Sequence, residues 1–233
     1  MKAGPPQNNY PAGHGAASSA FTLIHADDGL LVLDKPSGLL SVPGRGEDKQ
    51  DCLSNRVQRH YPDALIVHRL DQATSGLLLM ARGAAMQRAL SQAFESRHVF
   101  KRYIAVVEGL VGVAPCQPDG WGLIDLPIAV DWPRRPLRII DTAHGKASQT
   151  RWRVLGRDAA AHCTRLELEP LTGRSHQLRV HLQALGHPIL GDALYAPPEA
   201  QARAARLLLH ASALRFSHPA SGLAMAFESS PDF

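Results

Sequence analysis

A histidine, an arginine and an aspartate stand together in His68-Arg69-Leu70-Asp71, shortly before the apolar run of residues 77–81. The apolar run predicts a short buried strand, so these polar side chains should emerge where that strand begins. Nearby cations would keep the carboxylate of Asp71 ionised, and partial burial would remove the water that blunts a nucleophile. The segment therefore indicates a reacting carboxylate. A solvated loop with an Asp–Arg pair explains the same four residues about as well, because short motifs often occur by chance.

A second polar cluster, at residues 172–181, reads Thr-Gly-Arg-Ser-His-Gln-Leu-Arg-Val-His. It opens a predicted helix over residues 175–185, in which Leu178, Leu182 and Leu185 share one face and Gly186 provides a stop. Amide hydrogens at a helix N-terminus, together with neighbouring arginines, form an anion site that suits a phosphate or the carboxylate of Asp71. The two clusters are therefore expected to face each other. The alternative is a capped amphipathic helix with solvated Arg and His on its outer side.

Several other kinds of site are not indicated by the sequence. The chain has 12 histidines but no His-Glu-x-x-His, and its three cysteines have no Cys-x-x-Cys spacing. It also lacks a phosphate-binding Walker loop, a dinucleotide fingerprint and a Gly-x-Ser-x-Gly elbow. We therefore expect no metal, no nucleotide cofactor, no disulfide and no serine-hydrolase site.

The basic residues are mostly arginine. Lysine and arginine together number 25 for a formal net charge of +4, and only five of the 25 are lysine. Guanidinium groups bind phosphates in pairs of hydrogen bonds and stack on bases, so this bias favours nucleic acid as the partner. A GC-rich genome produces the same bias. The sequence contains neither a run of about 20 apolar residues nor a secretory signal, so we expect a cytoplasmic protein without membrane contact.

The pattern of apolar residues predicts a flexible tail over residues 1–20 and one domain over residues 21–233. Helical spacing occurs in residues 53–61, 84–97 and 175–185, and a long Pro- and Gly-rich connection with short strands spans residues 112–148. Strands are predicted over residues 30–33, 77–81, 100–108, 149–155, 164–168, 207–210, 213–217 and 223–227. Many strands that do not alternate strictly with helices predict a mixed α+β domain around a largely antiparallel sheet.

Four motifs, taken together and in this order, resemble the RluA family of RNA pseudouridine synthases. They are Asp-Lys-Pro-Ser-Gly-Leu-Leu-Ser-Val-Pro-Gly at residues 34–44, the segment 68–76, Lys-Arg-Tyr at 101–103 and the cluster at 172–181. The resemblance extends from about Phe21 to the C-terminus, without an S4-type RNA-binding module before the first motif. It implies the pseudouridine synthase fold with a central cleft and an isomerase that converts uridine in RNA to pseudouridine without a cofactor.

The resemblance also implies the catalytic residues. Asp71 would attack ribose C1′ or uracil C6, or help to remove a ribose proton to give a glycal, and the sequence does not distinguish these routes. Arg174 would pair with Asp71 and aim it. Tyr103 would lie against the target base and assist proton transfer at C5. Outside this family context, Tyr103 is simply an aromatic residue of an amphipathic strand.

A further group of residues is expected to bind RNA. Chemistry at C1′ and C5 requires the uridine to leave its stack, at a cost of a few kcal/mol. Arg69 resembles the family's arginine that enters the vacated space. Leu178 would pack on the other face of the uracil with Arg179 close by, and Arg134 and Arg135 in the long connection would meet phosphates.

Other details resemble a short subgroup of the family, which acts on large-subunit (23S) ribosomal RNA and the anticodon arm of transfer RNA. They include Asp131-Trp132-Pro133, Gly191-Asp192 and Tyr195-Ala196. A monomer is the default expectation. Two rival hypotheses are an RNA-binding module that has lost catalysis and a hydrolase of small substrates that uses an aspartate nucleophile. The first predicts binding without isomerisation, and the second predicts activity without RNA.

Overall fold

The computed structural model describes residues 21–112 and 119–233. The predicted tail, residues 1–20, lies outside the described residues. The helices are α1 Leu53–Gln58, α2 Gly83–Glu95, α3 Gln177–Ala184 and α4 Pro198–Ala202, with a 3₁₀ turn η1 Glu47–Lys49. The strands are β1 Thr22–Ala26, β2 Leu30–Lys35, β3 Ala64–Ile66, β4 Ser75–Arg82, β5 Phe100–Glu108, β6 Gly122–Asp125, β7 Ile128–Val130, β8 Arg138–Ile140, β9 Gln149–Asp158, β10 Cys163–Pro170, β11 Leu209–Ser217 and β12 Ala224–Glu228.

One large sheet carries the fold, in the order β1-β2-β4-β11-β5-β10-β9-β6. β3 pairs with β4 and β12 with β11 outside this path, while β7 and β8 form a separate hairpin. All of these pairings are antiparallel except β4 with β11, which run parallel over two residue pairs. The predicted mixed α+β class with a largely antiparallel sheet is therefore confirmed.

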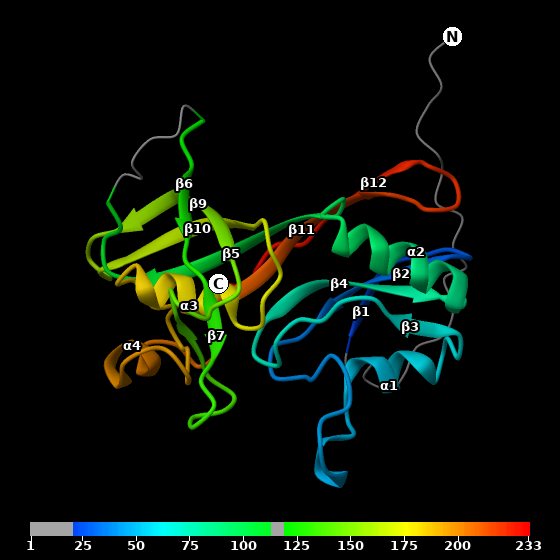
Figure 1. Cartoon of the computed structure of the whole chain (residues 1–233), viewed down its shortest axis with the longest axis horizontal. Coiled ribbons are helices and arrows are strands. Elements are labelled where there is room, and N and C mark those ends of the chain that lie inside the picture. The colour runs from blue at the N-terminus through cyan, green and yellow to red at the C-terminus, as the bar shows by residue number, and fades with distance from the viewer. Residues whose placement is uncertain (1–20, 113–118) are drawn as a thin grey trace.

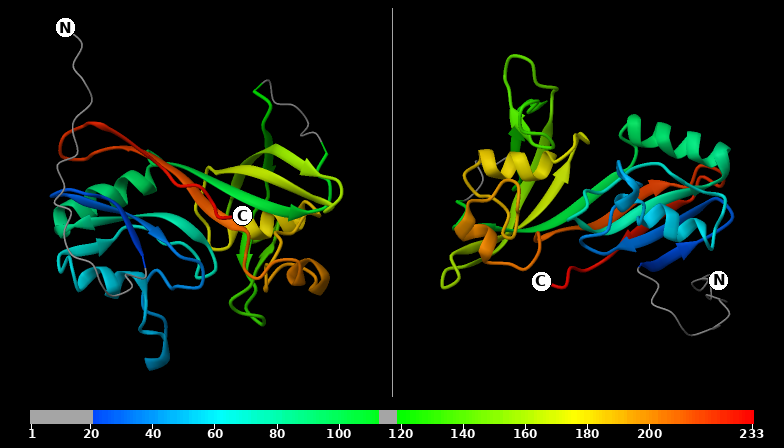
Figure 2. Two further views of the ribbon diagram at one scale, coloured as in Figure 1. Left: turned by 180° about the vertical axis from the view of Figure 1, so that it is seen from behind. Right: turned by 90° about the horizontal axis from the view of Figure 1, so that it is seen from below.

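The molecule has two halves joined by the long strands β5 and β11 (Figures 1 and 2). α1, α2 and β1 to β4 lie in one half, and α3, α4, β6, β9 and β10 lie in the other (Figure 1). Each half has its own buried apolar clusters, and the partly buried ring of Tyr103 packs against a cluster of each. Tyr103 therefore marks the junction of the two halves.

The parallel contact between β4 and β11 depends on a glycine. Gly76 has a φ of 107°, and a Cβ there would lie 2.4 Å from the backbone oxygen of Ala211. Only a residue without a side chain allows the two backbones to approach so closely. This approach fixes the start of β4, and with it the segment that carries Asp71, against the centre of the sheet.

Most of the predicted elements exist within a few residues of their expected ends. One difference is that the sequence predicts separate strands over residues 207–210 and 213–217, whereas Leu209–Ser217 forms the single strand β11. The register of β11 against β5 shifts between Ala211 and Ala213, so a local irregularity interrupts the alternation without ending the strand. The predicted long connection contains β6 and the β7–β8 hairpin.

Candidate active site

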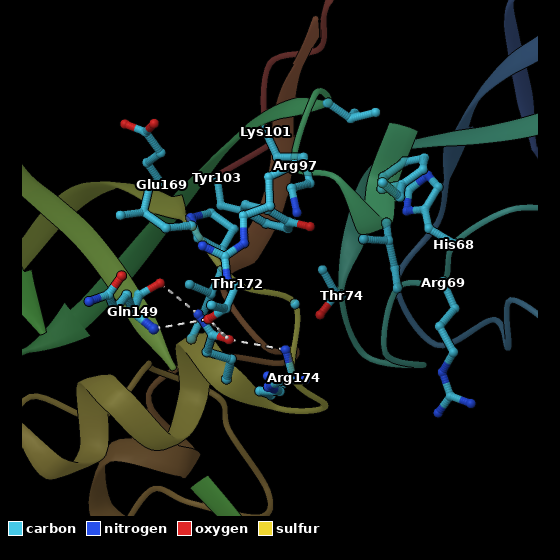
Figure 3. A pocket seen from close by; sticks show the side chains of 18 of the residues that line it. His68, Arg69, Thr74, Arg97, Lys101, Tyr103, Gln149, Glu169, Thr172 and Arg174 are labelled. Carbon is cyan, nitrogen blue, oxygen red and sulfur yellow. Dashed lines mark hydrogen bonds between the residues drawn. The ribbon is translucent and has the colours of Figure 1, made fainter. Parts of the chain in front are cut away.

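The cleft between the halves has a volume of about 760 Å³ and contains both polar clusters singled out in the sequence (Figure 3). One wall is formed by the segment from His68 to Asp71, and the facing wall by residues 169–174 and the first turn of α3. Tyr103 and Lys101 of β5 also line it. This volume lies in the range of roughly 300–1,000 Å³ that is typical of small-molecule pockets, so a nucleoside fits.

The segment that carries Asp71 is held by the motif at residues 34–44. The hydroxyl of Ser41 donates to the Leu70 carbonyl at 2.8 Å and accepts the Leu70 amide at 3.1 Å. The Ser37 hydroxyl donates to the Ala73 carbonyl at 2.7 Å. Residues on both sides of Asp71 thus have their backbone groups paired by this motif, which explains why it accompanies the aspartate.

Lys35 completes this clamp from a fully buried position. Its ammonium donates to the carbonyls of Pro36 and Leu39 at 2.8 Å and of Gln72 at 3.1 Å. Burial lowers the pKa of Lys35 to about 8, and the charge of Asp71 opposes that shift. The lysine is therefore a positively charged support directly behind the Asp71 segment, and sequence reasoning gave it no role.

We expect Lys35→Met to lower the free energy of unfolding by about 2–5 kcal/mol, because the buried carbonyl of Leu39 and the partly buried carbonyl of Pro36 lose their donor. The Gln72 carbonyl keeps a donor in this variant, because it also accepts the Gly38 amide at 2.9 Å. Urea unfolding measures the change. Lys49→Met, at an exposed lysine, is the matched control and should unfold like the wild type. An unchanged urea midpoint for Lys35→Met would contradict the role of Lys35 as a support of the Asp71 segment.

The effect of Lys35→Met on the free energy of unfolding should also depend on pH. Between pH 8 and about 10 the unfolded chain retains a Lys35 proton that the folded chain has lost, so the free energy of unfolding of the wild type rises with pH. Lys35→Met lacks this group. The difference between the two proteins should therefore change with pH only in this window, and a constant difference would oppose the lowered pKa.

His68 fixes the other end of the segment. Its Nε2 accepts the backbone amide of Leu79 in β4 at 2.9 Å, and its ring stacks on Phe94 of α2 with centroids 4.4 Å apart. Burial, with a smaller effect of Lys101, lowers the pKa of His68 to about 3. The ring is therefore neutral near pH 7, with its proton on Nδ1. It anchors the segment and does not supply charge to the cleft.

Arg179, in the first turn of α3, is the arginine nearest to Asp71. Its Nη1 lies 3.5 Å from Asp71 Oδ2, while its Nε and Nη2 bind both oxygens of Asp192 at 2.8 and 2.6 Å. Burial opposes the guanidinium charge, but the hydrogen bonds to Asp192 together with the negative charges of Asp192 and Asp71 outweigh it and raise the pKa of Arg179. Asp192 is fully buried and also accepts the Leu194 and Tyr195 amides. Arg179 is thus permanently charged and rigidly aimed.

The expected ion pair between Arg174 and Asp71 is wrong. Arg174 is exposed, its guanidinium lies 3.4 Å from the carbonyl of Ala147, and its amide donates to Gln177 at 3.0 Å. It precedes α3 in a loop whose backbone is held by the Gln177 side chain, and it lines the cleft from an exposed position without an ion pair to Asp71. Arg179, within the helix, lies beside the carboxylate instead. Sequence spacing alone did not reveal which of the two arginines faces the carboxylate.

Tyr103 and Leu178, which the sequence predicted to lie against the target uracil, both line the cleft that contains Asp71. Burial, with a smaller effect of the Asp71 charge, raises the pKa of the Tyr103 phenol. It is therefore a neutral hydrogen-bond donor or acceptor at ordinary pH. Leu178 is 6% exposed and packs in the core of the α3 half while one side faces the cleft.

The remaining predicted RNA-binding residues lie at the rim or away from it. Arg69 is exposed, and its side chain extends away from Tyr103 (Figure 3). Arg134 and Arg135 lie in the turn between β7 and β8 and do not line the cleft. Arg134 pairs with Asp131 at 2.7 Å, and Arg135 stacks 3.6 Å from the ring centre of the exposed Trp132.

Sequence reasoning missed His176, Lys35 and Asp192 as parts of the site. His176 Nε2 lies 3.9 Å from Asp71 Oδ1, and Asp192 holds Arg179. Lys35 and His176 lie within the motifs that carried the family resemblance, and Asp192 lies in a segment that resembles the subgroup, so the signal was present. It did not show which motif residues meet in space.

Comparison with known proteins agrees with this geometry. The model of the RNA pseudouridylate synthase family matches residues 29–184, which include Asp71, Tyr103 and all of α3. This chain belongs to that family, so it is an RNA pseudouridine synthase, an isomerase. The resemblance drawn from the four motifs is confirmed.

Similar curated proteins include dual-specificity RNA pseudouridine synthases. The dual-specificity RNA pseudouridine synthase RluA of Escherichia coli strain K12 is 49% identical over 213 residues, which cover 91% of this chain and 94% of that protein. The protein of the same description from Yersinia pestis is 47% identical over 211 residues, or 91% of this chain and 99% of that one. The likeness to RluA thus extends over nearly the full length of these relatives.

Solved structures show the same fold. Human RNA Pseudouridylate Synthase Domain Containing 1 superposes with a TM-score of 0.75 at 28% identity, covering 94% of this chain and 87% of that one. Human RNA Pseudouridylate Synthase Domain Containing 4 gives a TM-score of 0.70 at 24% identity, covering 91% and 89%, and supports the fold alone. The cleft thus lies in a pseudouridine synthase fold.

Two further observations concern residues 21–112 and 119–233 only. Among them, no helix combines the length and apolar character needed to cross a membrane. The same residues contain no group of three His, Cys, Asp or Glu side chains arranged to hold a metal ion.

Proposed function

We propose that this protein isomerises specific uridines of structured RNA, in 23S ribosomal RNA, in the anticodon stem-loop of transfer RNA or in both, with Asp71 as the nucleophile. The observation that carries the proposal is the Asp71 carboxylate in a nucleoside-sized cleft, 3.5 Å from a buried arginine and lined by Tyr103. The likeness to dual-specificity enzymes supports the choice of substrates.

The reaction needs no group donor. The bond between uracil N1 and ribose C1′ breaks, the uracil turns, and C5 bonds to the same carbon. C5 then loses its proton and N1 gains one, so product and substrate have the same composition. Asp71 attacks C1′ or C6 or removes a ribose proton, and the described geometry is compatible with each route.

The groups around Asp71 have distinct tasks in this proposal. Arg179 places a fixed positive charge beside the carboxylate and aims it, and because the contact is 3.5 Å long, it leaves the oxygens free to react. Tyr103 lies against the uracil and, as a neutral phenol, takes part in the proton transfer at C5. Leu178 packs on the other face of the base.

The uridine must first leave its stack. Arg69 is exposed at the cleft rim and extends outward from the segment that carries Asp71, so it is placed to fill the vacated space (Figure 3). The turn between β7 and β8 supports phosphate contacts through Arg134 and Arg135. Its Trp132 is 68% exposed and offers a stacking surface for a base.

We expect Arg69→Ala to reduce turnover of a folded stem-loop by about tenfold while a short unpaired oligonucleotide reacts nearly as fast as with the wild type. Only the stem-loop requires the cost of unstacking to be offset. The measurement is tritium release from uracil C5 on both RNAs, with exposed Arg88→Ala on α2 as the control. An equal loss on both RNAs would contradict a role in flipping.

The choice of substrates is tested with the purified chain and separate transcripts of 23S ribosomal RNA and of a transfer RNA. Pseudouridines are mapped by carbodiimide-blocked primer extension before and after incubation. New stops in either transcript support the proposal, and stops in both support dual specificity. A protein that modifies neither transcript would contradict it. Such substrates also imply a cytoplasmic protein, and we propose that it acts as a monomer.

A further inference from the structure

Tyr195 lies where the β7–β8 hairpin meets the catalytic cleft. Its side chain is 5% exposed, and its ring packs in a cluster with Ile128 of β7 and Val180 of α3. Leu137 and Ile140 of the hairpin pack against the same cluster. The proposed function gives Tyr195 no task, although the residue belongs to the motif that also supplies Asp192.

The other side of the tyrosine ring faces the group that pairs with Asp71. The guanidinium carbon of Arg179 lies 5.0 Å from the ring centre, a cation–π distance. Asp192 links the two residues as well, since its Oδ1 accepts both an Arg179 hydrogen bond and the Tyr195 amide. Movement of Tyr195 would therefore disturb the aim of Arg179.

The hydroxyl of Tyr195 joins two further groups. It accepts the backbone amide of Arg138 in β8 at 2.9 Å, and it lies 2.6 Å from Nδ1 of His176. Because the oxygen already accepts the Arg138 N–H, its own proton is available for His176 Nδ1. Burial lowers the pKa of His176, so the ring is neutral and carries its proton on Nε2. Nε2 is the atom 3.9 Å from Asp71 Oδ1.

His176 has a backbone that needs such support. Its φ of 59° is in the left-handed region, where residues other than glycine are uncommon and which costs about 1–3 kcal/mol. The side chain is held by the hydrogen bond to Tyr195 and by edge-on packing of the two rings at 83°. The charged groups that face His176 are Asp71, Arg179, Arg138 and Asp192.

We propose that Tyr195 is a positioning residue that couples the β7–β8 hairpin to Asp71 through His176 and Arg179. The connection runs from the Arg138 amide through the tyrosine hydroxyl to His176, whose Nε2–H faces the carboxylate. RNA bound by the turn of the hairpin is thereby positioned relative to the Asp71 carboxylate. The inference rests on the proposed function, since it takes Asp71 as the reacting carboxylate.

The test is a double-mutant cycle with the purified full-length protein under single-turnover conditions, on an RNA stem-loop tritiated at uracil C5. Tyr195→Phe keeps the ring but removes both hydrogen bonds, and His176→Gly keeps a residue suited to the left-handed backbone. Each variant should lower the rate constant about tenfold, with the Kd for the RNA changed by less than about twofold. The double variant should be no slower than the slower single variant. Tyr61→Phe, in the other half, is the matched control.

Two results would overturn the inference: a Tyr195→Phe rate constant equal to that of the wild type, or single effects that multiply in the double variant to about a hundredfold. If Tyr195→Phe unfolds at a lower temperature than the wild type, the rate constant of His176→Asn tests the inference instead. Asparagine tolerates the left-handed backbone but has no atom at Nε2, so the rate constant should fall in a stable protein. A wild-type rate constant there also overturns the inference.

Asp71→Asn is measured beside these variants, which separates two kinds of failure. Retained turnover in Asp71→Asn means that the proposed nucleophile is wrong. An inactive Asp71→Asn together with a fully active Tyr195→Phe leaves the nucleophile in place and removes only the coupling.

Discussion

Asp71→Asn is expected to abolish turnover while leaving the fold and RNA binding almost unchanged. Asparagine has the same shape as aspartate but is a poor nucleophile and base, so the rate should fall on the order of 10⁴- to 10⁶-fold. The fold should tolerate the change because the clamp from residues 34–44 holds the backbone around Asp71 and does not depend on its carboxylate. Tritium release from uracil C5 gives the rate, and filter binding gives the Kd for the RNA.

The control for this variant is Asp63→Asn, which loses an exposed ion pair with Arg82 worth about 0–1 kcal/mol and lies outside the cleft. It should turn over at the wild-type rate. Measurable tritium release by Asp71→Asn above the background without enzyme, at a rate within about tenfold of wild type, would contradict the assignment of Asp71.

Arg179→Gln is expected to damage both stability and activity. Asp192 is fully buried and would lose its bidentate partner, and an uncompensated buried charge typically costs about 3–5 kcal/mol. Asp71 would lose its nearest cation as well. Urea unfolding should therefore show a large loss, and turnover should fall even at temperatures where the variant remains folded.

Arg174→Gln is the matched control, because it makes the same chemical change at the arginine that the sequence had favoured. Its side chain is exposed, with contacts only at 3.4 Å to the Ala147 carbonyl, so its stability should stay within about 0.5 kcal/mol of the wild type. If Arg174→Gln lost stability and Arg179→Gln did not, the pairing read from the structure would be wrong.

The sequence predicted the fold because local residue patterns determine most of its helices and strands. Periodicity located β5 and α2 almost to the residue, and the motif order located Asp71 and Tyr103 in one cleft. Local patterns fail where two candidates lie close together in the chain. Arg174 and Arg179 are five residues apart with the left-handed residue His176 between them, and of the two it is Arg179 that lies 3.5 Å from the Asp71 carboxylate.

The sequence also did not predict the residues that support the site from behind, Lys35 and Tyr195. Nothing in the type of Lys35 shows that it is buried and bonded to three carbonyls, since lysine is usually exposed. Similarly, the contact of Tyr195 with His176 joins residues 19 positions apart, with α3 and the loop after it between them. Such contacts depend on the packing of α3 against the hairpin, which no short pattern encodes.

The central claim is that Asp71 of this chain converts uridine to pseudouridine in RNA. It is tested most directly by mapping pseudouridines with carbodiimide-blocked primer extension in cells that lack the protein and re-express either the wild type or Asp71→Asn. We predict that the wild type restores defined stops in ribosomal or transfer RNA and that Asp71→Asn, present at the same level, restores none. Stops restored equally by Asp71→Asn would contradict the account.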